Sequence, residues 1–235
     1  MSALAVEVLP DAAAVAARAA ERIAVEARSA VSQRGRFVLA VSGGHTPWMM
    51  LRALAGLELP WEQVHIVQVD ERVAPLGDKD RNLTHLHESL LNRAPIPPGN
   101  IHAMPVDLPD LDAAAAEYAG TLRAVAGAFS TIDLVHLGLG PDGHTASLVP
   151  GDPVLRVTDR LVAATGVYQG HRRMTLTCPA INRARAILWV VTGPEKVDAM
   201  ARLRRGDHSI PAGRIARTNA VVVADRDSQG PAGSN

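Results

Sequence analysis

One loop of this sequence concentrates residues suited to acid–base chemistry. The segment GLGPDGHTASLVPG, residues 138–151, surrounds Asp142 and His144 with glycines. Near neutral pH an imidazole is the side chain best suited to take a proton from water, and a carboxylate two residues away can orient it or contact a substrate. The alternative is a histidine that only caps a turn. The loop therefore predicts a general base at His144, with Asp142 beside it.

The same loop also fits the glycine spacing of a dinucleotide-binding fingerprint. Gly138, Gly140 and Gly143 match G-x-G-x-x-G, so a nicotinamide enzyme is one alternative. That fingerprint needs a full helix to follow it, whereas Pro150 and Pro153 interrupt the chain. We interpret the glycines as a loop that a substrate approaches closely, with Gly140 among its contacts.

A second loop, SGGHTP at residues 42–47, has the composition of an anion site. Its glycines let the backbone approach a ligand, and its serine and threonine add hydroxyl groups. A helix that begins at this point directs free N–H groups toward an anion. A tight turn with a threonine cap is the alternative. The loop predicts phosphate contacts at Ser42, Gly43, Gly44 and Thr46.

Charged residues in three other segments can complete such a site. In the tripeptide DER, Arg72 can clamp a phosphate or carboxylate and Asp70 can accept from sugar hydroxyls, although a solvated ion pair is equally compatible. Arg173 is a further candidate, but spacing does not choose between it and Arg172. Lys196, taken alone, is more typical of a solvated surface lysine.

The remaining reactive side chains lack a supporting pattern. His85 and His87 would face different sides of the helix expected there, and the other histidines show no ligand spacing. Cys178 has no base beside it. We therefore expect neither a metal site nor a catalytic thiol.

Apolar runs and helical patterns alternate along the chain and indicate what positions these loops. Runs of strand length lie at 36–42, 64–70, 132–138, 161–165, 173–177, 186–193 and 219–225. Helical periodicity lies at 11–33, 47–56, 83–93, 110–127 and 194–206. Strands that are apolar throughout are typical of a parallel sheet covered on both faces, and such sheets bind ligands beyond the carboxyl ends of their strands. We predict one Rossmann-like α/β domain over residues 1–226, mainly parallel, and a disordered polar tail at 227–235.

Composition excludes several classes of protein. The 235 residues carry 24 Lys and Arg and 24 Asp and Glu, and this balance disfavours nucleic acid as a partner. A single cysteine disfavours a disulfide framework and favours a cytoplasmic location. The alanine-rich start is interrupted by acids, unlike a signal peptide, and no apolar run could cross a membrane. We expect a cytoplasmic monomer whose partner is a small molecule.

Five segments in this order resemble the 6-phosphogluconolactonase family: SGGHTP, DERVAPLGDKDRN, GLGPDGHTASLVPG, RMTLTCPAIN and VTGPEK. The resemblance extends from about Phe37 to Lys196. It implies the fold shared by glucosamine-6-phosphate deaminases and ribose-5-phosphate isomerases. It also implies hydrolysis of 6-phospho-D-glucono-1,5-lactone to 6-phospho-D-gluconate in the oxidative pentose phosphate pathway, without a cofactor.

The resemblance also assigns roles to individual residues. It makes His144 the general base, and Asp70 and Arg72 substrate contacts at a strand end. The phosphate would be held by Ser42, Gly43, Gly44 and Thr46, helped by Arg173 and Lys196. The sequence departs from the family pattern at His45, Val149 and Arg81. The last of these precedes Asn82, a further expected substrate contact.

Two rival functions stay open. Glucosamine-6-phosphate deaminases resemble this chain in the D-G-H loop but commonly carry an acid where Val149 stands. A sugar-phosphate sensor without catalytic activity would need an attached DNA-binding segment and a basic patch, and we expect neither.

Overall fold

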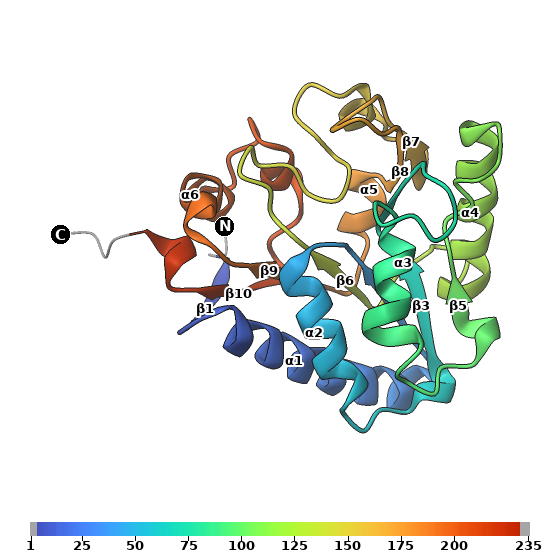
Figure 1. Ribbon diagram of the computed structural model, residues 1–235, viewed down its shortest axis with the longest axis horizontal. Helices are drawn as coiled ribbons and strands as arrows, with labels where there is room; N and C mark the ends of the chain where they lie inside the picture. Colours follow the sequence, from blue (N-terminus) through green and yellow to red (C-terminus); the bar gives the residue numbers. More distant parts are fainter. Residues whose placement is uncertain (1–3, 231–235) are drawn as a thin grey trace.

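A main sheet of seven parallel strands organises the protein, whose computed structural model describes residues 4–230 (Figure 1). From one edge to the other the strands are β1 (Ala5–Leu9), β10 (Ala220–Asp225), β9 (Ala186–Val191), β6 (Leu134–Leu137), β2 (Phe37–Val41), β3 (Val64–Gln68) and β5 (Ile101–His102). All their pairings are parallel. The predicted fold class is confirmed.

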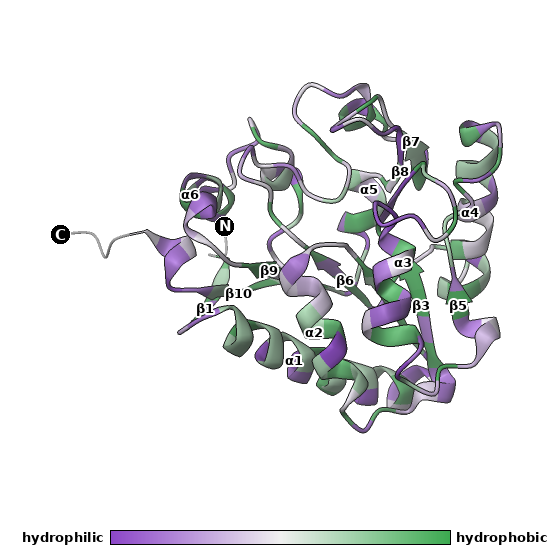
Figure 2. Cartoon of the chain, viewed as in Figure 1, coloured by the Kyte–Doolittle hydropathy of each residue, from purple (hydrophilic) through white to green (hydrophobic). Residues whose placement is uncertain are grey.

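The strands of the main sheet are mainly apolar because both faces of the sheet are covered. In β2, Phe37 and Leu39 belong to one buried cluster, whereas Val38 and Ala40 belong to the other. Successive side chains of a strand point to opposite faces, so every position of such a strand must be apolar. Figure 2 shows the central strands mainly in the hydrophobic colour, while the helices carry hydrophilic stripes.

Helices form the covering layers, and each layer packs against one of the two clusters. One face is covered by α1 (Ala12–Arg34), α2 (His45–Ala55) and α3 (Asn82–Leu86), which continues into a π-helical turn at His87–Leu91. The other face is covered by α4 (Leu111–Ala126), α5 (Cys178–Asn182) and α6 (Val197–Arg205). No helix within residues 4–230 has the length and apolar character needed to cross a bilayer.

Helix α1 begins and ends next to residues that cap it. The Asp11 side chain accepts a hydrogen bond from the Ala14 amide, and Gly35 takes a left-handed conformation with φ 73° while its amide donates to the Val31 carbonyl. These are the expected signals for a helix start and a helix stop. Helix α2 begins two residues earlier than predicted, so Pro47 is its third residue and still lies in the first turn.

A second, antiparallel sheet packs over one face of the main sheet. Its strands, in order, are β4 (Asp70–Arg72), β8 (Arg173–Leu176) and β7 (Val162–Ala164). The run at 64–70 was predicted as one strand, but it divides at Val69. The Val69 amide donates to the Val41 carbonyl of the main sheet, and the Val69 carbonyl accepts from the Leu176 amide of the second sheet. One residue therefore joins the two sheets.

Both ends of the described chain contain more structure than predicted. Strand β1 was not expected; it pairs with β10 at the edge of the main sheet, and its Glu7 pairs with Arg18 of α1 at 2.7 Å. The first residues of the tail predicted from residue 227 are structured, because a helical turn at Asp227–Gln229 buries Ser228, whose hydroxyl donates to the Asp225 carbonyl. The rest of that tail, residues 231–235, lies outside the described residues.

Candidate active site

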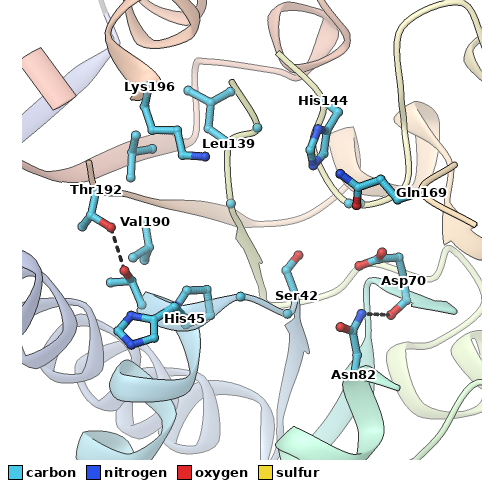
Figure 3. Close-up of a pocket in the computed structure, with 18 of the residues that line it drawn as sticks. Ser42, His45, Asp70, Asn82, Leu139, His144, Gln169, Val190, Thr192 and Lys196 are labelled. Atoms are coloured by element: carbon cyan, nitrogen blue, oxygen red, sulfur yellow. Dashed lines mark hydrogen bonds between the residues drawn. The ribbon is translucent and has the colours of Figure 1, made fainter. Parts of the chain in front are cut away.

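A cavity of about 300 Å³ opens at the carboxyl ends of β2, β6 and β9, beside the second sheet (Figure 3). Its wall includes almost every residue predicted for the site: Ser42, Gly43, Gly44, Thr46, Asp70, Arg72, Asn82, Gly140, His144, Arg173 and Lys196. Asp142 alone does not line it. Figure 3 separates two groups of side chains, with Thr192 and Lys196 on one side and Asp70 and His144 on the other. The cavity therefore has two distinct ends.

The first end, the glycine-loop end, consists of residues 42–47 together with Thr192 and Lys196. Gly44 has φ 129°, a conformation that favours glycine, and it leads into α2 without any side-chain cap. The first amides of α2 therefore remain free at the cavity wall, where they can bind an anion. Gly43 has no room for a side chain, because an added Cβ would overlap the Asn82 amide.

A buried histidine supports the glycine loop from below. His136, in β6, is fully buried, and burial lowers its pKa to about 3, so the ring is neutral. Its Nδ1 accepts from the Ser42 amide at 3.3 Å, and its carbonyl accepts from the Ser42 hydroxyl at 3.1 Å. The ring proton must therefore sit on Nε2. The sequence analysis did not single out His136, since a histidine within an apolar run carries no recognisable motif.

The glycine loop is tied to the end of β9. The hydroxyls of Thr46 and Thr192 lie 2.6 Å apart. Lys196 follows in a short helical turn, and its Nζ lies 3.4 Å from Glu195 Oε1. The structure places Lys196 on the cavity wall rather than on the open surface, so a cation lies close to the free amides of α2.

The second end, the histidine end, includes Asp142, His144, Tyr168 and the charged residues of the second sheet. Asp142 lies behind His144 and not on the cavity wall. Its Oδ1 accepts from His144 Nδ1 at 2.6 Å and from the His144 amide at 3.1 Å. Of the two roles the sequence left open for Asp142, this position fits orienting the imidazole and not contacting a substrate.

The protonation of this pair follows from its contacts. Partial burial works to raise the pKa of Asp142, but the hydrogen bonds that it accepts from His144 and Tyr168 outweigh burial, so the pKa is lowered. Because an ionised carboxylate accepts the Nδ1 proton, Nε2 is the ring nitrogen left without one. Gly140 lets the ring lie close to the loop, since an added Cβ there would overlap it.

Two arginines from neighbouring strands face the cavity at the histidine end. Arg72 and Arg173 are registered partners in the antiparallel pair of β4 and β8. Arg72 Nη1 donates to the Asp80 carbonyl at 3.1 Å. The Nε atoms of both arginines are buried and have no hydrogen-bond partner among residues 4–230. Arg172 is exposed, so of the two arginine candidates it is Arg173 that lines the cavity.

Asp70 is the buried carboxylate of the cavity wall. Burial raises its pKa, although a hydrogen bond from Ser147 and the charges of Arg173 and Arg72 oppose the rise. Its Oδ2 accepts from the Ser147 hydroxyl at 2.6 Å, and its carbonyl accepts from Asn82 Nδ2 at 3.0 Å. Asp70 and Asn82 therefore form one polar patch beside the arginines.

The second carboxylate of the DER segment has a structural role. Glu71 is fully buried and accepts from the amides of Asn82 and Leu83, both at 2.8 Å, so it caps α3. Arg81, one of the departures from the family pattern, is also buried and donates to Asp107 Oδ1 at 2.8 Å. It points away from the cavity and leaves the Asn82 side chain there.

Several wall residues were not predicted. Gln169, Thr192 and Glu195 line the cavity, and Tyr168 contacts the histidine pair from outside it. The only sequence signal near Tyr168 and Gln169 is Gly170, which is typical of a turn but says nothing about chemistry. Within residues 4–230, no group of three or more His, Cys, Asp or Glu side chains could hold a metal ion.

Comparisons with known proteins give one consistent result. The family of glucosamine-6-phosphate isomerases and 6-phosphogluconolactonases matches residues 10–224. A 6-phosphogluconolactonase from Nostoc sp. is 39% identical over 202 residues, which cover 84% of each chain. A solved 6-phosphogluconolactonase structure from Thermotoga maritima has a TM-score of 0.84 at 29% identity, covering 94% of this chain and 98% of that one. A monomeric glucosamine-6-phosphate deaminase, 18% identical with a TM-score of 0.83 and covering 96% of this chain and 98% of its own, shares the fold.

Proposed function

Because this chain belongs to the family of glucosamine-6-phosphate isomerases and 6-phosphogluconolactonases, we propose that its cavity hydrolyses 6-phospho-D-glucono-1,5-lactone with His144 as the general base. The relationship to 6-phosphogluconolactonases over most of the chain identifies it as a lactone hydrolase. The observation that carries the residue assignment is that His144, held by Asp142 at 2.6 Å, lines the same cavity as the glycine loop.

The substrate phosphate binds at the glycine-loop end in this proposal. The free amides at the start of α2 and the nearby Lys196 ammonium group supply hydrogen bonds and positive charge. These contacts lie at the opposite end of the cavity from His144 (Figure 3). Binding energy from the unreactive phosphate therefore positions the ester carbonyl at the histidine end.

At the histidine end, His144 Nε2 takes a proton from water as the water oxygen forms a bond to C1 of the lactone. Asp142 holds the ring through Nδ1 and stabilises the imidazolium that results. Arg72 and Arg173 have unpartnered Nε donors and supply positive charge for the tetrahedral oxyanion. The C1–O5 bond then breaks, and the imidazolium returns its proton to the departing ring oxygen, which gives 6-phospho-D-gluconate.

The test is His144→Ala, assayed against lactone generated in situ with the spontaneous hydrolysis subtracted. We expect the catalysed rate to fall by about 10²–10⁴-fold, the range typical of one general base. Calorimetric binding of 6-phospho-D-gluconate should be largely kept, because the glycine-loop end is unchanged. His208→Ala is the matched control, since His208 is exposed and does not line the cavity. A His144→Ala rate near that of the wild type would overturn the proposal.

The same preparations separate this activity from the rivals. Ammonia release from glucosamine 6-phosphate at a rate comparable to lactone hydrolysis would assign the site to a deaminase. Val149, at the position where deaminases commonly carry an acid, is buried and does not line the cavity. A sensor would bind the sugar phosphate and show no turnover above background in the wild type.

A further inference from the structure

Tyr168 begins a two-residue hairpin turn in a segment outside the recognised motifs. Its amide donates to the His171 carbonyl at 3.0 Å, and the His171 amide donates to the Tyr168 carbonyl at 3.3 Å. Between them, Gln169 and Gly170 both have positive φ, 50° and 84°, as in a type I′ turn. His171 Nε2 lies 3.2 Å from Asp80 Oδ2. The turn and this contact fix where the Tyr168 side chain leaves the backbone.

The Tyr168 side chain packs against the pair formed by Asp142 and His144. Its hydroxyl donates to Asp142 Oδ2 at 3.2 Å, while Oδ1 of the same carboxylate accepts from His144. The phenol ring meets the imidazole edge to face, with centroids 5.4 Å apart and an interplanar angle of 65°. Each carboxylate oxygen therefore has a protein donor, and the imidazole has an aromatic wall beside it.

The same ring contacts a cation of the cavity wall. The guanidinium carbon of Arg173 lies 5.0 Å from the centroid of the Tyr168 ring, and Nη2 donates to the Tyr168 carbonyl at 3.2 Å. Tyr168 thus connects Arg173, which faces the cavity, with the histidine pair behind it.

His144 holds only Oδ1 of the Asp142 carboxylate, through its ring and its amide, so Oδ2 depends on Tyr168. The Asp142 side chain is 40% exposed, so water competes for its oxygens. Burial and the negative charge of Asp142 raise the pKa of Tyr168, so the phenol keeps its proton and acts as the donor. Without that hydroxyl, the carboxylate would be held through Oδ1 alone, and Oδ2 would be left to water.

We propose that Tyr168 is a positioning residue for the lactonase reaction. Its hydroxyl fixes Asp142, which in turn keeps the His144 ring oriented with Nε2 available to water. This inference rests on the proposed function, in which His144 is the base. Because the hydroxyl acts through Asp142 and not on the substrate, its removal should lower kcat and leave KM nearly unchanged.

The first experiment is Tyr168→Phe, which keeps the ring against His144 and Arg173 and removes only the hydroxyl. We expect kcat to fall about 10-fold, because small displacements of a catalytic group are costly. KM should stay within about two-fold of the wild-type value, and the melting temperature should not change, since the ring packing is kept. An unchanged kcat in this variant would overturn the inference.

The other tyrosine of the chain provides a matched control. Tyr118 is fully buried; its hydroxyl accepts from the Gln68 amide at 2.7 Å and donates to the His102 carbonyl at 3.0 Å, away from the cavity. Tyr118→Phe should lower the melting temperature and leave kcat of the folded enzyme unchanged. The two variants thus separate loss of a structural hydroxyl from loss of a positioning one.

A double-mutant cycle tests whether Tyr168 acts through Asp142. In an Asp142→Ala background, Tyr168→Phe should have no further effect on kcat. The same 10-fold loss in both backgrounds would mean that the hydroxyl acts elsewhere, and the inference would fail. His144→Ala reports separately on the proposed function: if it is inactive while Tyr168→Phe is fully active, only the positioning role is wrong.

Discussion

The two ends of the cavity are built in different ways. At the glycine-loop end, the groups facing the cavity are mainly backbone amides at the edge of the main sheet, supported by the fully buried His136. At the histidine end, they are side chains from three separate segments. The side chains of His144 and Asp142 remain partly exposed, at 23% and 40%, whereas those of Asp70 and Arg173 are buried.

In the proposed function, this difference separates binding from reaction. Backbone amides held by a sheet and a helix keep their positions without further support, which suits a site that only has to hold an anion. An imidazole must be held in one tautomer and one orientation, and that requires hydrogen-bonded neighbours. We therefore expect damage at the glycine-loop end to raise KM, and damage at the histidine end to lower kcat.

The largest effect should come from Gly140→Ala at the histidine end. The added methyl group would overlap the His144 ring and displace it. We expect kcat to fall by about 10²-fold or more, because a displacement of about 1 Å can cost that much. KM for the lactone should change little, and steady-state kinetics with background subtraction measures both values.

Gly120→Ala is the matched control for that substitution. Gly120 lies exposed within α4, and nothing lies within 4 Å of an added Cβ. Alanine should raise the free energy of unfolding by about 0.5–1 kcal/mol and leave kcat unchanged. If both glycine variants lost activity equally, the effect of Gly140→Ala would not come from the His144 ring.

The next effect concerns His136, which supports the glycine-loop end. Burial lowers its pKa from 6.5 to about 3. As the pH falls below 6.5, the imidazole is therefore protonated in the unfolded chain while it stays neutral in the folded protein. The free energy of unfolding therefore carries no penalty from His136 above pH 6.5, and it decreases as the pH falls from 6.5 toward 3. Between pH 7.5 and pH 4, the free energy of unfolding should drop by about 3 kcal/mol more for the wild type than for His136→Leu.

Urea unfolding at several pH values measures this difference. Burial also lowers the pKa of His65 and of His102, but both titrate in the two proteins, so subtraction isolates His136. Parallel pH profiles for wild type and variant would contradict the assignment of His136 as a buried neutral ring.

The smallest effect should come from Gly43→Ala at the glycine-loop end. The added Cβ would overlap the Asn82 side chain and displace the loop. We expect KM to rise about 10-fold, because the amides that hold the phosphate shift, and kcat to fall less than in Gly140→Ala. A change in kcat alone would show that the two ends are not separable.

The fold was predictable where a local pattern agrees with the global structure. The caps of α1 at Asp11 and Gly35, and the apolar strands β2, β6 and β9, could be placed from the residues alone. The division at Val69 could not, because no glycine or proline marks it and Val69 continues the strand-like pattern up to Asp70. Strand β1 is short and lies at an edge with a charged residue, so its pattern is weak.

The candidate site, like the fold, was predictable only in part. The proximity of the loops after β2 and β6 could be predicted, because parallel strands end at the same edge of a sheet. Tyr168 and Gln169 could not be placed, since they reach the cavity through the antiparallel sheet and a tight turn. His136 was also missed, because its contact with Ser42 joins residues 94 positions apart. The roles assigned to these residues remain predictions.

The position of Val69 limits how the enzyme can deform. Since Val69 is hydrogen-bonded to both sheets, it couples the position of the short antiparallel sheet to that of the main sheet. Arg72 and Arg173 are paired positions of the neighbouring strands β4 and β8, so their backbones move together. A tilt of the short sheet would therefore carry the backbones of both arginines toward or away from the glycine loop together.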